Sequence, residues 1–142
     1  SVPGRQRAEG YRSAIAAAGI EVDVQLIHGG DFSAELGEEG AARMLKMAIE
    51  AGEAQRFEES HGHVVKATTI LRGLAQHLNP QKGEDVADQM AKTYHSLIMA
   101  ALGAYGRPDA PARYRRIIKS LNELRDAWSF VLKQNAGSPA SA

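Results

Sequence analysis

The chain of 142 residues is long enough for one compact domain, with or without a short appendage. Its 17 basic and 17 acidic residues give a formal net charge of zero, which argues against a protein that wraps nucleic acid or coats an anionic membrane. Cysteine is absent, so the chain has no disulfide and no cysteine nucleophile. The sequence shows neither a signal peptide nor an apolar run near the ~20 residues that span a bilayer, so we expect a soluble cytoplasmic protein.

The charge balance changes near residue 40. Residues 1–40 carry three basic and seven acidic side chains, a net of −4, whereas residues 41–142 carry 14 basic and 10 acidic side chains, a net of +4. This shift suggests a first domain over 1–40 and a second over 41–134, although a single domain can also have a polarised surface. The small polar residues 135–142 are expected to form a disordered tail.

The first domain is predicted to contain a helix, a strand and the start of a second helix, with Ser33 as its N-cap and Glu35, Glu38 and Glu39 near its positive end. Residues 5–18 are rich in helix formers and stop at Gly19. Residues 22–28 alternate apolar and polar side chains, as a short strand does. A single strand cannot satisfy its own backbone hydrogen bonds, so we expect it to pair with the same strand of a second chain. Such pairing would make the protein a homodimer.

The rest of the chain is predicted to be helical. Apolar residues recur at helical spacing in four segments, at residues 41–50, 54–78, 84–104 and 111–134. Glycine and proline residues separate the segments, and Leu124 and Trp128 lie on the apolar stripe of the last one. The expected fold is therefore mainly α, an antiparallel up-and-down helical bundle with an N-terminal helix–strand appendage.

Few residues are candidates for catalysis or metal binding. His61 and His63 would point about 200° apart on a helix and cannot share one metal ion. The turn Gly29-Gly30-Asp31 lacks the spacing and the lysine of a phosphate-binding loop. We therefore expect no enzymatic activity, no cofactor and no metal.

A basic cluster opens the last predicted helix. Its four members are Arg113, Arg115, Arg116 and Lys119. The cluster flanks the apolar stripe as a solvated helix face does, and the chain as a whole is not basic. We therefore expect no nucleic-acid partner.

Two motifs in the second domain are the most specific in the sequence. Residues 82–87 read Lys-Gly-Glu-Asp-Val-Ala, and residues 123–128 read Glu-Leu-Arg-Asp-Ala-Trp. Together with the stretches that begin at Met44 and Lys66, they follow in order and spacing the flagellar secretion chaperone FliS, which the chain resembles over about residues 44–132. The resemblance implies a helical bundle in the cytoplasm that binds the C-terminal helical segment of flagellin, prevents early polymerisation and delivers flagellin for export. That segment would fold on the chaperone as it binds.

A small bundle with this many apolar residues can offer a groove to an amphipathic partner helix. Periodicity alone does not separate groove residues from core residues, and several of the candidates can serve as core. If the groove exists, we expect it on the helices predicted over 54–78 and 84–104, among Ile70, Leu74, Tyr94, Ile98 and Leu102. Tyr94 matches the first tyrosine of the family's Leu-Tyr-x-Tyr-Met stretch, whereas Thr93, Ser96 and Leu97 depart from it.

The start of the chain lacks the flexible arm and the Leu-Tyr-Asp-Gly-Ala segment typical of the FliS family. Residues 7–23, 30–37 and 41–45 instead resemble a fragment of the effector-binding domain of LacI-type repressors, so this resemblance covers about residues 5–45. Two alternatives to a chaperone therefore stay open. One is a recombinant or designed chimera, a de novo protein of two unrelated fragments that folds without an evolved activity. The other is a remnant of a LacI-type effector-binding domain, although most of that domain is missing.

Overall fold

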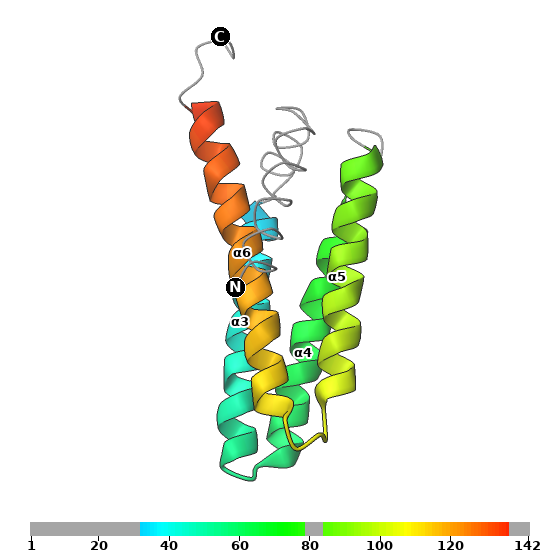
Figure 1. Cartoon of the computed structure of the whole chain (residues 1–142), viewed down its shortest axis with the longest axis vertical. Helices are drawn as coiled ribbons and strands as arrows, with labels where there is room; N and C mark the ends of the chain where they lie inside the picture. The colour runs from blue at the N-terminus through cyan, green and yellow to red at the C-terminus, as the bar shows by residue number, and fades with distance from the viewer. Residues whose placement is uncertain (1–31, 79–83, 137–142) are drawn as a thin grey trace.

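The computed structural model describes residues 32–78 and 84–136, and these residues form four helices without a strand. The helices are α3 (Phe32–Glu53), α4 (Phe57–Gln76), α5 (Glu84–Ala104) and α6 (Ala110–Ala136). They run alternately up and down, with the α3–α4 and α5–α6 turns at the same end of the molecule (Figure 1). The predicted antiparallel helical bundle is therefore confirmed. The helix and strand expected over residues 5–28 lie outside the described residues.

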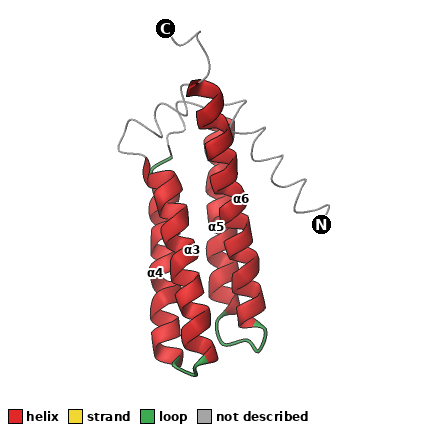
Figure 2. Cartoon of the chain, turned by 90° about the vertical axis from the view of Figure 1, so that its left-hand side faces the viewer, coloured by secondary structure: helices red, strands yellow, loops and turns green. Residues whose placement is uncertain are grey.

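The four helices form a ring in which each packs against two neighbours, α3 against α4 and α6, and α5 against α4 and α6. The α3–α4 pairing is the most extensive, and the two helices lie side by side in Figure 2. The core is built mainly from alanine and long aliphatic side chains, with Tyr94 among its largest fully buried members. None of the four helices is long and apolar enough to cross a membrane.

Helix α3 begins at Phe32, close to the N-cap that the sequence predicts at Ser33, and continues without a break through the segment predicted over residues 41–50. Ala34, Glu38, Ala41 and Leu45 follow one another at helical spacing and are all buried. Residues before Ala41 therefore belong to the same buried face as those after it. The expected domain boundary at residue 40 falls inside α3.

Two glycines of α3 leave room for side chains of α4. A Cβ atom at Gly37 would lie 2.7 Å from Leu74 Cδ2, and a Cβ atom at Gly40 would lie 3.7 Å from Ile70 Cδ1. A Cβ atom at the first position would overlap Leu74. The two glycines therefore allow Leu74 and Ile70 to pack closely on α3.

The α3–α4 turn and the α5–α6 turn each contain a residue with a left-handed backbone conformation. Gln55 has φ 65°, its N–H donates to the Gly52 carbonyl at 3.0 Å, and the Arg56 N–H donates to the Ala51 carbonyl at 2.8 Å. This pair of bonds is the Schellman pattern that ends a helix. In the other turn, Gly106 has φ 82°. With these residues, the chain reverses direction from α3 to α4 and from α5 to α6 at the same end of the molecule.

Candidate partner-binding surface

The five residues expected to line a groove lie at different depths in the bundle. Tyr94 and Ile98 of α5 are buried in the core. Ile70 and Leu74 of α4 are partly buried and pack against the core on the side of α3. Leu102 of α5 is exposed, with 41% of its surface accessible. All five therefore lie on the adjacent helices α4 and α5, and of the five Leu102 is the exposed one.

Tyr94 reaches across the bundle to α3. Its hydroxyl donates a 2.7 Å hydrogen bond to Oε2 of Glu38, and both side chains are shielded from solvent. A polar group at this depth needs hydrogen-bond partners, because desolvation without them costs free energy. The contact therefore couples α5 to α3 inside the core. From the sequence, Glu38 was interpreted as an acidic residue near the positive end of a helix, and its helical spacing with Ala34 and Leu45 was the signal that it is buried.

Exposed apolar side chains gather on the outer side of the α4–α5 pair. Met99 and Leu102 of α5 and Tyr105, which directly follows the end of α5, are spaced by three residues, and Met99 is 66% exposed. On α4, Val65 is exposed one turn after His61, whose ring lies 4.6 Å from the ring of Tyr105 between centroids. This ring contact places the two sets of residues on one side of the bundle. We call Val65, Met99, Leu102 and Tyr105 the α4–α5 apolar surface.

Sequence reasoning identified one member of this surface, Leu102, and missed the other three. Val65 and Met99 lie off the main apolar stripes of their helices, and Tyr105 follows the end of α5. The available signal on α5 is a short second stripe of Met99 and Leu102, one turn apart. Such a stripe extends the apolar side of a helix beyond what its core needs.

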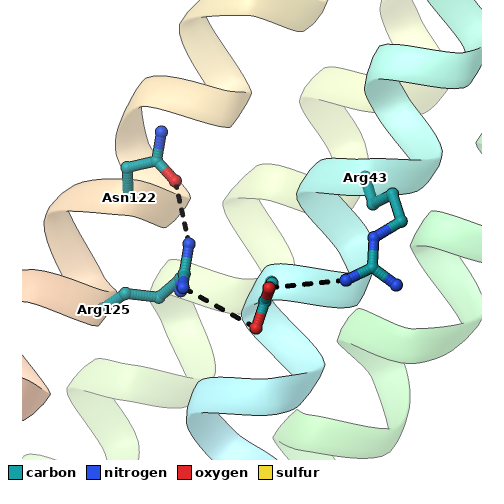
Figure 3. Close-up of polar contacts among 4 residues, drawn as sticks. Arg43, Asn122 and Arg125 are labelled. Carbon is teal, nitrogen blue, oxygen red and sulfur yellow. Dashed lines mark hydrogen bonds and ion pairs between the residues drawn. The ribbon is translucent and has the colours of Figure 1, made fainter.

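The side of the bundle between α3 and α6 is polar. Glu39 of α3 accepts a hydrogen bond from Arg43 at 3.4 Å, and its other carboxylate oxygen lies 3.7 Å from Arg125 Nη2 of α6 (Figure 3). Arg125 also donates to Asn122 Oδ1 at 3.5 Å. Partly exposed ion pairs of this kind contribute little stability each. They do place Arg125, which belongs to the Glu-Leu-Arg-Asp-Ala-Trp motif, against α3.

The basic cluster at the start of α6 is partly engaged in ion pairs. Arg113 Nε donates to both carboxylate oxygens of Asp109 at 2.9 Å, and this hydrogen bond holds the pKa of Asp109 below its ordinary value. Arg115 Nη2 lies 3.7 Å from Glu53 Oε2 of α3. These contacts fit the interpretation of the cluster as a helix surface.

Among the described residues, no group of three or more histidine, cysteine, aspartate or glutamate side chains could hold a metal ion. His61 packs against Tyr105, with the two ring planes inclined by 48°. His77 Nδ1 lies 2.7 Å from the Gly73 carbonyl oxygen one turn earlier in α4. These two histidines therefore have local contacts in the bundle.

Comparison with known proteins identifies one family. The chain matches the family described as flagellar protein FliS over residues 36–135. No curated protein and no solved structure matches the chain significantly. None of these comparisons supports a LacI-type fragment or a chimera, and the match begins within residues 5–45, which the sequence analysis compared with that fragment. FliS proteins are flagellar export chaperones and not enzymes. Since the match covers more than half of its length, the chain belongs to the FliS family.

Proposed function

We propose that this protein binds the C-terminal helical segment of flagellin in the cytoplasm and keeps it from polymerising before export. Membership of the FliS family over residues 36–135 is the observation that supports this function. The partner segment arrives disordered and folds on the chaperone, so the apolar area buried on binding must offset the cost of ordering the segment.

The α4–α5 apolar surface is the part of the described bundle that suits an amphipathic helix. A helix that binds in a groove presents apolar residues at positions i, i+3, i+4 and i+7. Met99 and Leu102 of α5 offer apolar surface that Tyr105 continues just after the helix, and Val65 extends it onto α4. In this arrangement Leu102 contacts the partner, whereas Tyr94 and Ile98 support the surface from the core. Ile70 and Leu74 hold α4 in place against α3.

The test is a calorimetric titration of the full chain with a peptide of the flagellin C-terminal segment. We expect a dissociation constant in the micromolar range or tighter. Leu102→Asp should weaken binding at least about tenfold, because a charge would then be buried in the apolar contact. Leu36→Asp is the matched control, since Leu36 is also exposed but lies on α3.

Two outcomes would contradict the proposal. Equal weakening by both variants would show that the α4–α5 apolar surface is not the contact. No binding by the well-folded wild-type chain would favour the alternative of a fold without an evolved partner.

Light scattering on the same sample tests the homodimer expected from pairing of the predicted strand, because a monomeric mass with an ordered N-terminus would contradict it.

A further inference from the structure

A pocket is lined by residues of α3, α4, the α5–α6 turn and the start of α6. The α3–α4 and α5–α6 turns lie at the same end of the molecule (Figure 1). It has a volume of about 470 Å³, which is within the usual range of small-ligand sites. Its lining is largely apolar and aromatic and includes Ile49, Phe57, Tyr105, Pro111 and Tyr114. We call it the end pocket. It is distinct from the α4–α5 apolar surface, apart from Tyr105, which belongs to both.

The first polar feature of the end pocket is the hydroxyl of Tyr114. Tyr114 is 3% exposed, and its hydroxyl has no hydrogen-bond partner among the described residues. Burial, with a smaller effect from Tyr105, raises the pKa of Tyr114, so the hydroxyl is a neutral group that can donate a hydrogen bond. A buried donor without a partner costs free energy, and a ligand that accepts its hydrogen bond would remove this cost.

The second polar feature is a positive charge that makes no close ion pair among the described residues. The pKa of Asp109 is lowered first by the hydrogen bond from Arg113, which already pairs with it, and to a smaller extent by the charge of Arg107. Arg107 lines the end pocket, and its Nε donates to the Gly103 carbonyl at 2.8 Å. None of the carboxylates in the described ranges lies within ion-pair distance of its guanidinium group. Glu53, the other charged residue of the lining, is already paired with Arg115 at 3.7 Å. The guanidinium of Arg107 therefore offers donors in the planar geometry that suits a carboxylate.

We propose that the end pocket binds an aromatic ring that carries a carboxylate. The ring packs against Phe57, Tyr105 and Pro111, as aromatic groups do in apolar pockets. The carboxylate accepts hydrogen bonds from Arg107 and Tyr114. Two sources have this chemistry, a free aromatic acid and a peptide whose C-terminal residue is aromatic.

The test compares two probes that share the ring and its chain and differ at the terminal group, the carboxylate of 3-phenylpropanoate and the neutral amide of 3-phenylpropanamide, by NMR titration of the full chain. We expect the acid to bind with a dissociation constant of about 1 mM or tighter, given its small size. It should bind about threefold more tightly than the amide, the preference that a partly exposed charge pair gives. Equal affinity of the two probes, or no shifts around the end pocket at about 10 mM acid, would overturn the proposal.

Variants separate the two polar features. Arg107→Gln should remove the preference for the acid, whereas Arg116→Gln, at an exposed arginine of α6 outside the pocket lining, should keep it. Tyr114→Phe should lower the affinity for the acid at least about twofold without lowering the melting temperature, because the hydroxyl has no partner among the described residues. A purely structural role of Tyr114 would give the opposite pattern. Loss of the preference in Arg116→Gln would also contradict the proposal, since it would indicate non-specific attraction.

A second pair of probes distinguishes the two sources. These are a short glycine peptide ending in phenylalanine with a free carboxylate, and the same peptide with an amidated C-terminus. Tighter binding of the free-carboxylate peptide than of 3-phenylpropanoate supports the proposal with a peptide as the source. Binding of 3-phenylpropanoate without binding of the peptide supports it with a free acid.

Discussion

At the residue scale, the hydrogen bond from Tyr94 to Glu38 is a polar contact made wholly inside the core. Tyr94→Phe keeps the ring and removes the hydroxyl that donates to the buried carboxylate. We expect the free energy of unfolding to fall by about 1–3 kcal/mol, measured by urea denaturation. The control is Tyr105→Phe, at an exposed tyrosine directly after the same helix, which should change the free energy of unfolding by less than about 0.5 kcal/mol. Equal effects of the two variants would show that the contact with Glu38 adds no stability.

Leu124 tests the packing of α6 at the same scale. It is fully buried, as its position on the predicted apolar stripe requires, whereas the side chain of Trp128 lies outside those that the structure describes. Leu124→Ala removes apolar contacts and leaves a cavity, so we expect a loss of ~3–5 kcal/mol in the free energy of unfolding. Leu36→Ala is the control at an exposed leucine and should cost less than about 0.5 kcal/mol. A loss below about 1 kcal/mol for Leu124→Ala in denaturant melts would mean that the inward face of α6 is assigned wrongly.

At the scale of elements, the hydrophobic period predicts the helices well and their ends less well. Helix α5 has the predicted bounds, and α4 and α6 differ from theirs by a few residues. Helix α3 differs most, because the sequence divides it into a helix that starts near Ser33 and a segment over residues 41–50, with the weak helix formers Gly37 and Gly40 between them. Packing on α4 decides the conformation there, and a contact between distant segments is not visible in a local pattern.

Gly37 offers a direct test of this packing. An alanine in place of glycine inside a helix usually adds up to about 1 kcal/mol of stability. At Gly37 the new Cβ would lie 2.7 Å from Leu74 Cδ2, so Leu74 must shift and the gain is lost. Gly62→Ala is the matched control, because nothing lies within 4 Å of a Cβ there. We expect Gly37→Ala to be at least about 1 kcal/mol less stable than Gly62→Ala in urea denaturation, and equal stabilities would contradict the close approach of α3 and α4.

The candidate surface was harder to predict than the bundle. The sequence identifies apolar residues on α4 and α5. The hydrophobic period alone does not show that Tyr94 is buried in the core and that Leu102 is exposed to solvent. That distinction depends on where the neighbouring helices lie, which sets how far the buried side of α5 extends around its axis. Met99 falls beyond that limit and is exposed, and Tyr105 is exposed just after the end of the helix.

At the scale of the whole molecule, the two sides of the bundle differ in chemistry. The α3–α6 side is joined by ion pairs of Glu39 and Arg125, and the α4–α5 side presents exposed apolar residues. An amphipathic partner helix gains more from the second side, because burial of apolar surface is the larger favourable contribution to association. The proposed chaperone function therefore assigns one side to internal contacts and the other to the partner.

The packing of the whole molecule also determines whether the residues before and after position 40 fold together. Glu38 and Glu39 contact Tyr94 and Arg125, so the described part of the expected first domain is packed into the bundle. We therefore expect one cooperative unfolding transition in urea, and the same free energy of opening for the backbone amides of residues 38–45 when measured by hydrogen exchange. The amides of α4 around Leu71, which is fully buried, serve as the internal reference. Exchange of residues 38–40 through a separate opening, at a much lower free energy than that of residues 41–45, would contradict this expectation. The helix would then not be a single folding element, and the domain boundary expected at residue 40 would separate two folding units.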